Sequence, residues 1–247
     1  MIILKNRKEI AALRDAGRIA AIVRNYVASH VAPGITTAEL SELANKKMKE
    51  LGAESAFLNY RGFPGIICVS VNDEVVHGIP GKRRIAIGDV VSIDIGVRYC
   101  GFIGDTATTV IAGISDTALA KLVSVTEKSL YNGIKKAVAG NHVGDISYVI
   151  EKTAKDAGFN VVRQFVGHGV GRNIHEEPEI PNFGEPATGP LLKEGMVIAI
   201  EPMLNMGGWE VEVMGDGWTV KTADGSISAH FEHMVSVGKT EAEILTK

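Results

Sequence analysis

The chain has 247 residues, of which 45% are hydrophobic and 22% charged, and its formal net charge is −3. This balance is typical of a globular protein with a large core, and it excludes a global basic field that would attract nucleic acid or an acidic membrane. The two cysteines, Cys68 and Cys100, form neither a CxxC pair nor a disulfide framework, which suits a reducing compartment. Because the sequence contains no run of 18 apolar residues and no signal-peptide core, we expect a cytoplasmic protein without a membrane span.

Two helices are predicted at the start of the chain. Apolar residues recur at helical spacing over residues 6–30, and Pro33 ends this pattern. Thr36 followed by Glu39 is a capping box, which predicts a second helix that continues to Gly52. Apolar segments after this helix predict strands near residues 66–71, 89–97 and 102–111.

The same succession of elements then returns. Two further helices are predicted over residues 116–139 and 145–157, and Gly140 and Gly158 end them. Strands are predicted near residues 160–166, 196–201, 210–214 and 229–237.

A shorter sequence similarity between the two halves supports an internal repeat. The stretches GDVVSID at 88–94 and GMVIAIE at 195–201 both place an acid six residues after a glycine, at the end of an apolar strand. We therefore predict one α/β (α+β) domain over residues 1–247, built from two related halves at about 1–112 and 113–247. Chance similarity between two α/β segments of this length is the alternative.

The predicted hairpin at residues 91–110 has an unfavourable feature. Each of its apolar strands carries one aspartate, Asp94 and Asp105. If the turn centres between Tyr99 and Cys100, the two aspartates lie directly opposite each other on one face, where like charges destabilise a sheet. A buried carboxylate without a partner is also costly, so the hairpin requires a compensating positive charge.

Three further residues with metal-ligand chemistry lie in apolar or glycine-rich contexts: His168 in FVGHGVG, Glu201 in MVIAIEP and Glu232 in SAHFEHMVSV. Two divalent cations would balance the four carboxylates and convert their repulsion into ligation. An oxygen-rich set with one nitrogen suits Mn, Fe, Co or Zn. Each residue alone is more often a turn residue, a surface glutamate or a loop hydrogen-bonder, so the hypothesis depends on all five occurring together.

The ordered motifs HGIP, IDIG, GDT, GHGVG, HEEP, IEP and FEH resemble those of the methionine aminopeptidases, a family of M24 metallopeptidases. The lack of an insert between His168 and Glu201 resembles the type I branch, and the start of the chain resembles the short bacterial form without a zinc-binding extension. The resemblance covers nearly the whole chain. It implies the pita-bread fold, in which helices cover an antiparallel sheet with a pseudo-two-fold repeat.

The resemblance also implies a reaction. A metal-bridging hydroxide attacks the first peptide bond and removes the N-terminal methionine from newly made proteins whose second residue is small. The implied partners are the N-termini of nascent polypeptides, with the ribosome as a potential docking place, and we expect a monomer.

The implied metal site holds two divalent ions, whose identity among Mn, Fe, Co and Zn the sequence leaves open. Asp94 is expected to chelate one ion, while Asp105 and Glu232 bridge both. His168 and Glu201 are expected to complete the ligands of the second ion.

Catalytic and substrate-binding roles follow from the same resemblance. Glu201 is expected to take the proton of the attacking water, His77 to contact the scissile amide, and His175 to stabilise the tetrahedral intermediate. With these two histidines, the expected methionine pocket is lined by Tyr60, Phe63, Cys68, Trp218 and Phe231.

Two positions depart from the family pattern. Many relatives have an aromatic residue where this chain has Ile174, which concerns the mouth of the pocket. Many have a hydroxyl residue where this chain has Gly96, which concerns a hydrogen bond near the metals. We assign no role to His230 and His233, which flank Glu232.

Three other functions compete with this interpretation. A proline-specific peptidase of the same fold would use the same five ligands, but such proteins usually carry an additional N-terminal domain. A metal-free binding protein would lose ligands, and this chain keeps all five. A dinuclear phosphoesterase would more often show several histidines and a basic phosphate clamp, and we find neither in this sequence.

Overall fold

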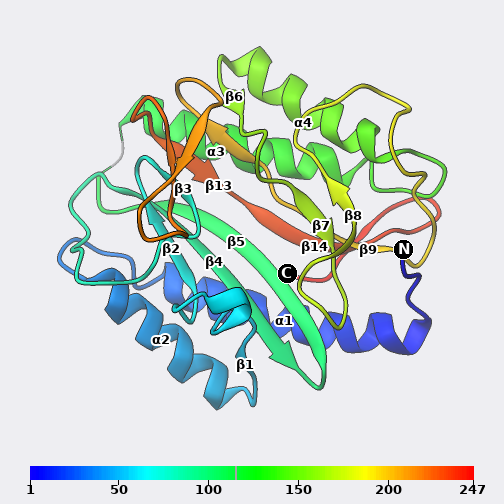
Figure 1. Ribbon diagram of the computed structural model, residues 1–247, viewed down its shortest axis with the longest axis horizontal. Coiled ribbons are helices and arrows are strands. Elements are labelled where there is room, and N and C mark those ends of the chain that lie inside the picture. The colour runs from blue at the N-terminus through cyan, green and yellow to red at the C-terminus, as the bar shows by residue number, and fades with distance from the viewer. Residues whose placement is uncertain (115) are drawn as a thin grey trace.

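Two pairs of α-helices flank the strands of the molecule (Figure 1). The computed structural model describes residues 1–114 and 116–247. Within these residues, the helices are α1 (Arg7–Ala28), α2 (Thr37–Glu50), α3 (Thr117–Ile134) and α4 (Val143–Ala157), and a 3-10 turn, η1, spans Tyr60–Gly62. No helix of the described part of the chain is both long and apolar enough to cross a bilayer.

The first two helices begin at capping boxes. Asn6 accepts hydrogen bonds from the first turn of α1, and Glu9 reaches back to the Asn6 amide at 3.0 Å. Thr36 and Glu39 do the same for α2, with distances of 3.1 Å and 2.7 Å. The capping box at Thr36 is therefore confirmed, and it satisfies amides that the first helical turn cannot pair.

The third helix is shorter than predicted. It ends at Ile134 instead of residue 139. Beyond it, the amide of Ala139 donates to the carbonyl of Gly238 at 2.9 Å, and Val138 forms a bridge with the same residue. The amides of Lys136 and Ala137 still bond locally, to Gly133 and Ile134, and a distant backbone replaces the helical partner only at Ala139.

A nine-stranded antiparallel sheet forms the centre of the molecule. Its main path runs β1-β4-β5-β14-β9-β7-β8, while β2 pairs with β4 and β15 pairs with β14. These strands are β1 (Glu54–Ser55), β2 (Cys68–Val71), β4 (Val90–Tyr99), β5 (Phe102–Ile111), β7 (Gly167–Gly169), β8 (Glu176–Ile180), β9 (Val197–Ile200), β14 (Glu232–Ser236) and β15 (Glu243–Ile244).

Two three-stranded antiparallel sheets accompany it, with the orders β13-β10-β6 and β11-β12-β3. Their strands are β3 (Glu74–Val76), β6 (Asn160–Val161), β10 (Met203–Asn205), β11 (Val211–Val213), β12 (Val220–Thr222) and β13 (Ser228–His230).

Two predicted strands differ in the structure. The strand expected at 160–166 leaves its sheet after Val161, although the next amide still donates to Met203. The strand expected at 229–237 divides at Phe231, where the chain passes from a small sheet into the central one. In both cases the partner strands, and not the local apolar pattern, decide where pairing stops.

Each half of the chain has its own apolar core. The first packs α1 and α2 on β2, β4 and β5, and the second packs α3 and α4 on β9, β13 and β14. Both halves therefore run from two helices to an antiparallel strand pair of the central sheet. Their order agrees with the expected repeat, whose limits at 112 and 113 stay a prediction.

Candidate active site

A tight turn sets the register of the β4–β5 hairpin. Tyr99 pairs with Phe102, so only Cys100 and Gly101 form the turn. Their φ angles of 48° and 78° are both positive, as a two-residue type I′ turn requires. The turn thus lies one residue further along the chain than the sequence pattern predicts.

This register places the two aspartates on one face but not opposite each other. Asp105 lies opposite Gly96, and Asp94 lies opposite Ala107. The prediction of directly facing aspartates is wrong, because moving the turn by one residue shifts every partner by two. Strand alternation keeps both carboxylates on the same face as diagonal neighbours. Ala107 also pairs with Glu232 of β14, which brings a third carboxylate to this face.

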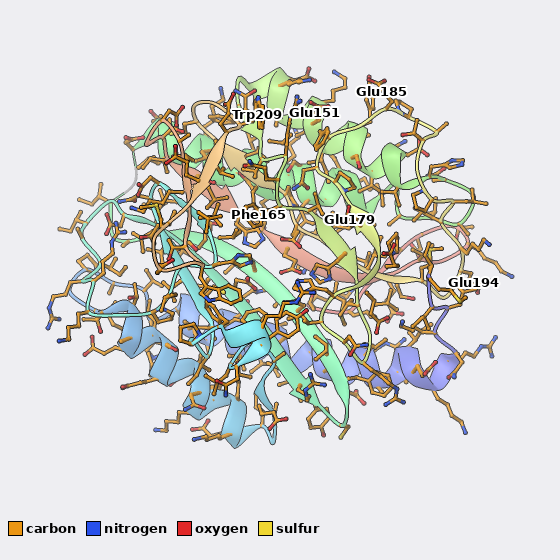
Figure 2. The ribbon with its side chains drawn as sticks, viewed as in Figure 1. Glu151, Phe165, Glu179, Glu185, Glu194 and Trp209 are labelled. Atoms are coloured by element: carbon orange, nitrogen blue, oxygen red, sulfur yellow. The ribbon has the colours of Figure 1, made fainter. Side chains whose placement is uncertain are left out.

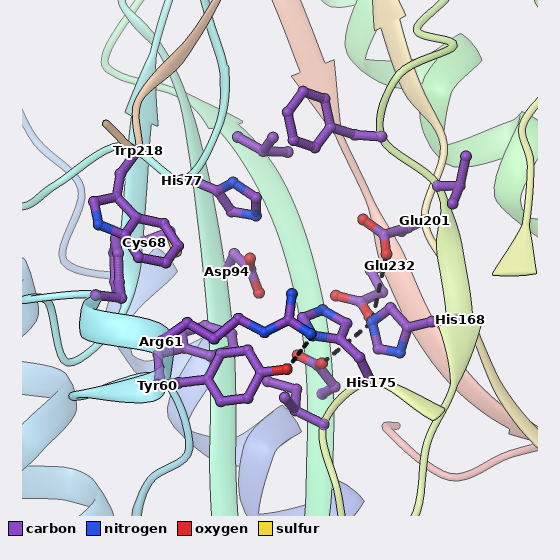
Figure 3. Close-up of a pocket in the computed structure, with 17 residues that line it drawn as sticks. Tyr60, Arg61, Cys68, His77, Asp94, His168, His175, Glu201, Trp218 and Glu232 are labelled. Atoms are coloured by element: carbon purple, nitrogen blue, oxygen red, sulfur yellow. Dashed lines mark hydrogen bonds and ion pairs between the residues drawn. The ribbon is translucent and has the colours of Figure 1, made fainter. Parts of the chain in front are cut away.

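Strands β7 and β9 bring the remaining two residues to the same face. His168 pairs with Ala199, and Ala199 pairs with Met234 on the other side. Glu201 follows Ala199 by two residues and therefore shares its face. Figure 3 shows the His168 ring and the Glu201 carboxylate turned toward the hairpin carboxylates.

One imidazole nitrogen faces the carboxylates. His168 Nε2 lies 3.5 Å from Glu201 Oε1 and 3.8 Å from Asp105 Oδ2. One ligand atom each from Asp105, His168 and Glu232 lies within 4.8 Å of the others. His168 Nδ1 lies 3.0 Å from the Gly169 carbonyl, to which it donates, so Nε2 keeps its lone pair for the cluster.

The cluster is rich in negative charge, and its Asp105, His168 and Glu232 are buried while Asp94 and Glu201 are half-buried. Burial raises the pKa of Asp94 to about 7, and burial with mutual repulsion raises the pKa values of Asp105, Glu201 and Glu232 well above the ordinary range. Burial lowers the pKa of His168 to about 3, so its ring is neutral.

Several of these buried oxygens lack partners. One oxygen each of Asp94, Asp105 and Glu232 has no hydrogen-bond partner in the described part of the chain. Unpaired carboxylate oxygens together with a neutral imidazole nitrogen are the ligand atoms that divalent cations bind. The residues present therefore fit a metal site.

The cluster lies in a pocket of about 180 Å³ whose lining combines charged and imidazole side chains with aromatic and aliphatic ones. Six of the seven predicted substrate-binding residues line it, namely Tyr60, Phe63, Cys68, His77, His175 and Trp218. Ile174 lines it as well.

Other lining residues had no predicted role: Phe57, Arg61, Val76, Phe165 and Val166. Figure 2 shows Phe165 over the central strands. Adjacency to Tyr60 and to His77 is a sequence signal for Arg61 and Val76, whereas the fold brings the other three to the pocket.

Phe231 lies outside this lining. The residue is 7% exposed and belongs to the apolar core that α3 and α4 cover, which also contains Leu130 and Ile150. It directly precedes Glu232, whose side chain faces the pocket. Successive side chains in extended backbone point to opposite faces, which explains why Phe231 turns away.

The two predicted catalytic histidines lie at the pocket. The Tyr60 hydroxyl is 2.8 Å from His175 Nδ1, and the His175 ring centroid is 4.4 Å from that of His168. His77 packs edge-to-face on Trp218 at 6.3 Å between centroids. Burial lowers the pKa of His77 to about 4 and also lowers the pKa of His175, so both rings are neutral at neutral pH.

The two histidines without a predicted role lie in different places. His230 Nε2 is 3.7 Å from Glu201 Oε2, and burial lowers the pKa of His230 to about 3. His233 instead points to Thr246, whose hydroxyl lies 2.8 Å from its Nδ1. His230 therefore lies beside the cluster, two residues before Glu232, although the sequence alone assigned it no role.

Comparison with known proteins agrees with this geometry. Residues 11–239 match metallopeptidase family M24. The protein named methionine aminopeptidase 1 from Bacillus subtilis is 47% identical over 247 residues, which is 100% of both chains. The crystal structure of a methionine aminopeptidase from Thermotoga maritima has a TM-score of 0.98 and 45% identity, and the match covers 100% of both chains.

More distant structures share the architecture. A prolidase structure from Pyrococcus furiosus has a TM-score of 0.81 at 24% identity, and the match covers 99% of this chain and 65% of that chain. The predicted pita-bread fold is confirmed, and a metallopeptidase family implies the use of a divalent metal. Because sequence and fold agree over its whole length, the chain belongs to metallopeptidase family M24, within its methionine aminopeptidases.

Proposed function

We propose that the protein removes the N-terminal methionine from newly made polypeptides whose second residue is small. One observation carries this proposal: the buried carboxylate and imidazole cluster shares a pocket with aromatic and sulfur-bearing side chains. A metal cluster alone suits many hydrolases. The adjoining apolar lining additionally suits an unbranched thioether, which makes favourable contacts with aromatic rings.

The proposed metal site holds two divalent ions through Asp94, Asp105, His168, Glu201 and Glu232. Four carboxylates balance the charge of two such ions, and one nitrogen among many oxygens suits Mn, Fe, Co or Zn. When bound, the ions supply an activated water and a Lewis acid for the substrate carbonyl.

Three residues perform the proposed proton transfers and contacts. Glu201 accepts the proton of the water and passes it toward the leaving amine. With Tyr60 donating to Nδ1, the neutral ring of His175 carries its proton on Nε2, where it donates to the oxyanion. His77, neutral through burial, contacts the scissile amide without adding charge.

The proposed methionine recess begins beside the cluster. Cys68 lies opposite Asp94 in the β2–β4 pairing, so both reach the same face. Phe63 and Trp218 pack edge-to-face at 5.1 Å between centroids and enclose the recess. A free α-amine suits the adjacent carboxylates, which restricts cleavage to the terminal residue. Ile174 leaves the mouth wider than an aromatic residue would, so we expect modest activity on leucine or norleucine.

We also propose where the enzyme acts. Its partners are the N-termini of nascent polypeptides, at the ribosome or after release, and this substrate places it in the cytoplasm. We propose a monomer as the active form.

A peptide panel tests the proposal. With the metal-loaded enzyme, we expect cleavage of Met-Ala-X and Met-Gly-X peptides but not of formyl-Met-Ala-X or Met-Lys-X. Removing one methylene from a group in an apolar pocket costs about 1–3 kcal/mol, so alanine in the first position should react far more slowly. Chelation should abolish activity, and Mn, Fe or Co should restore it.

Two outcomes would overturn parts of the proposal. Preference for Xaa-Pro peptides, whatever the first residue, would replace the methionine assignment by the proline-specific one. Full activity in a verified metal-free preparation would reject the metal-dependent mechanism.

A further inference from the structure

A buried ion pair joins the N-terminal segment to the loop that carries His175. Lys5 Nζ lies 2.5 Å from Glu176 Oε2, and the two side chains are 5% and 8% exposed. The Lys5 amide donates to the Gly195 carbonyl at 2.7 Å, so the segment before α1 is itself anchored. Glu176 directly follows His175 and begins β8. The pair is thus one peptide bond away from a residue of the pocket.

The other oxygen of Glu176 holds the backbone of the loop. Glu176 Oε1 accepts hydrogen bonds from the amides of Arg172 and Asn173, at 3.1 Å and 3.2 Å. The surroundings are tightly packed, because a Cβ on Gly171 would lie 2.6 Å from Glu176 Oε1 and 2.7 Å from Lys5 Cε. One carboxylate therefore ties the loop to itself and to the N-terminal segment.

The charge of Lys5 keeps that carboxylate in place. A buried carboxylate that loses its only cation is strongly unfavourable, and it moves toward water if it can. Among the described ion pairs, Lys5 is the cation that neutralises Glu176. Without it, Glu176 would leave the Arg172 and Asn173 amides, and the loop would lose the bonds that fix its path.

The ring of His175 has few other constraints. Its Nδ1 meets the Tyr60 hydroxyl, and its ring packs against His168. Both contacts require the His175 backbone to be correctly placed, because a shift of about 1 Å breaks a hydrogen bond of 2.8 Å.

We propose that Lys5 is a positioning residue for His175, acting through Glu176 and the loop at residues 171–175. The inference rests on the proposed catalytic role of His175. A purely structural ion pair would stabilise the fold without any particular dependence on that histidine.

A double-mutant cycle on the metal-loaded enzyme distinguishes a positioning role of Lys5 from a purely structural one. Lys5→Met should lower kcat at least tenfold, while KM changes less than threefold and metal content is unchanged. In a His175→Ala background, the same substitution should lower kcat less than twofold further, because no imidazole is left to position. Lys8→Met, which removes an exposed lysine from the first turn of α1, is the matched control and should change neither constant.

Each outcome decides the question. Normal kcat in Lys5→Met, or full additivity with His175→Ala, would overturn the proposal. Normal kcat in His175→Ala itself would instead overturn the role of His175 under the proposed function. If Lys5→Met does not fold, Glu176→Gln replaces it in the cycle, since it removes the charge but keeps an acceptor oxygen. Non-additivity is then expected again, and additivity again overturns the proposal.

Discussion

Gly96 leaves room for an aromatic ring of the pocket. A Cβ built on Gly96 would lie 2.3 Å from Phe57 Cε1 and 2.7 Å from its Cδ1 and Cζ atoms. The Phe57 residue is 8% exposed and lines the pocket, and Gly96 lies opposite Asp105. The ring thus occupies the space where the family pattern would place a hydroxyl side chain.

Gly96→Ala should therefore destabilise the protein. Carbon atoms in contact lie about 3.5–4.0 Å apart, so the ring must move by about 1 Å or more. Overpacking of this kind costs about 1–3 kcal/mol. Replacing glycine by alanine also stabilises by about 0.4–1 kcal/mol through the unfolded chain. We expect a net loss of about 1–2 kcal/mol in the free energy of unfolding.

Urea unfolding of the metal-free protein measures this loss. Phe57→Ala alone should cost about 3–5 kcal/mol, as for other buried phenylalanines. Adding Gly96→Ala to it should change the free energy of unfolding by less than about 0.5 kcal/mol, because the new methyl group enters vacated space. Gly215→Ala is the control, since a Cβ on Gly215 would meet no described atom within 4 Å and the φ of this glycine is not positive. Additive costs in the double variant, or a Gly96→Ala protein as stable as Gly215→Ala, would refute the reasoning.

Three further predictions concern the cluster and the pocket. Asp105→Ala should lose metal, as measured by elemental analysis, yet keep its circular dichroism spectrum, because one of several repelling carboxylates disappears; two ions bound at wild-type affinity would contradict the ligand assignment. His175→Ala should lower kcat by about 10²–10³ with little change in KM or metal content, as expected for a lost oxyanion donor; loss of metal from this variant would instead make His175 a metal ligand. Metal binding at pH 7 should release protons, because the raised pKa values of Asp94, Asp105, Glu201 and Glu232 keep the metal-free cluster partly protonated. Affinity should accordingly fall as the pH is lowered through these pKa values, and a binding heat that is identical in buffers of different ionisation enthalpy would speak against proton release.

Local signals in the sequence were sufficient for several features. The capping box at Thr36 and Glu39 predicts where α2 begins, because it depends on residues within one turn. Strand alternation predicts that Asp94 and Asp105 share a face, and this is confirmed although the turn lies one residue further along than predicted. The five proposed ligands could be selected because acids and histidine are rare in apolar strands.

Pairing between strands that are distant in the sequence decided how the site is assembled. Pairing of β5 with β14, and of β9 with β7, determines that Glu232 and His168 meet the hairpin aspartates, and no local pattern encodes which strands become neighbours. The turn at Cys100 and Gly101 depends on both residues adopting positive φ, which the sequence permits but does not require of cysteine.

The difference between local sequence signals and long-range packing also explains which residues line the pocket. Phe231 turns into the core because its side chain alternates with that of Glu232, whereas the resemblance to the family predicted a pocket residue. His230 and Phe57 lie only two and three residues from Glu232 and Tyr60, but only the packed structure shows that they reach the site. The sequence by itself determined which chemical groups are available and on which face of a strand they lie. The tertiary structure decided which of them meet, because that depends on the burial of two apolar cores against one shared sheet.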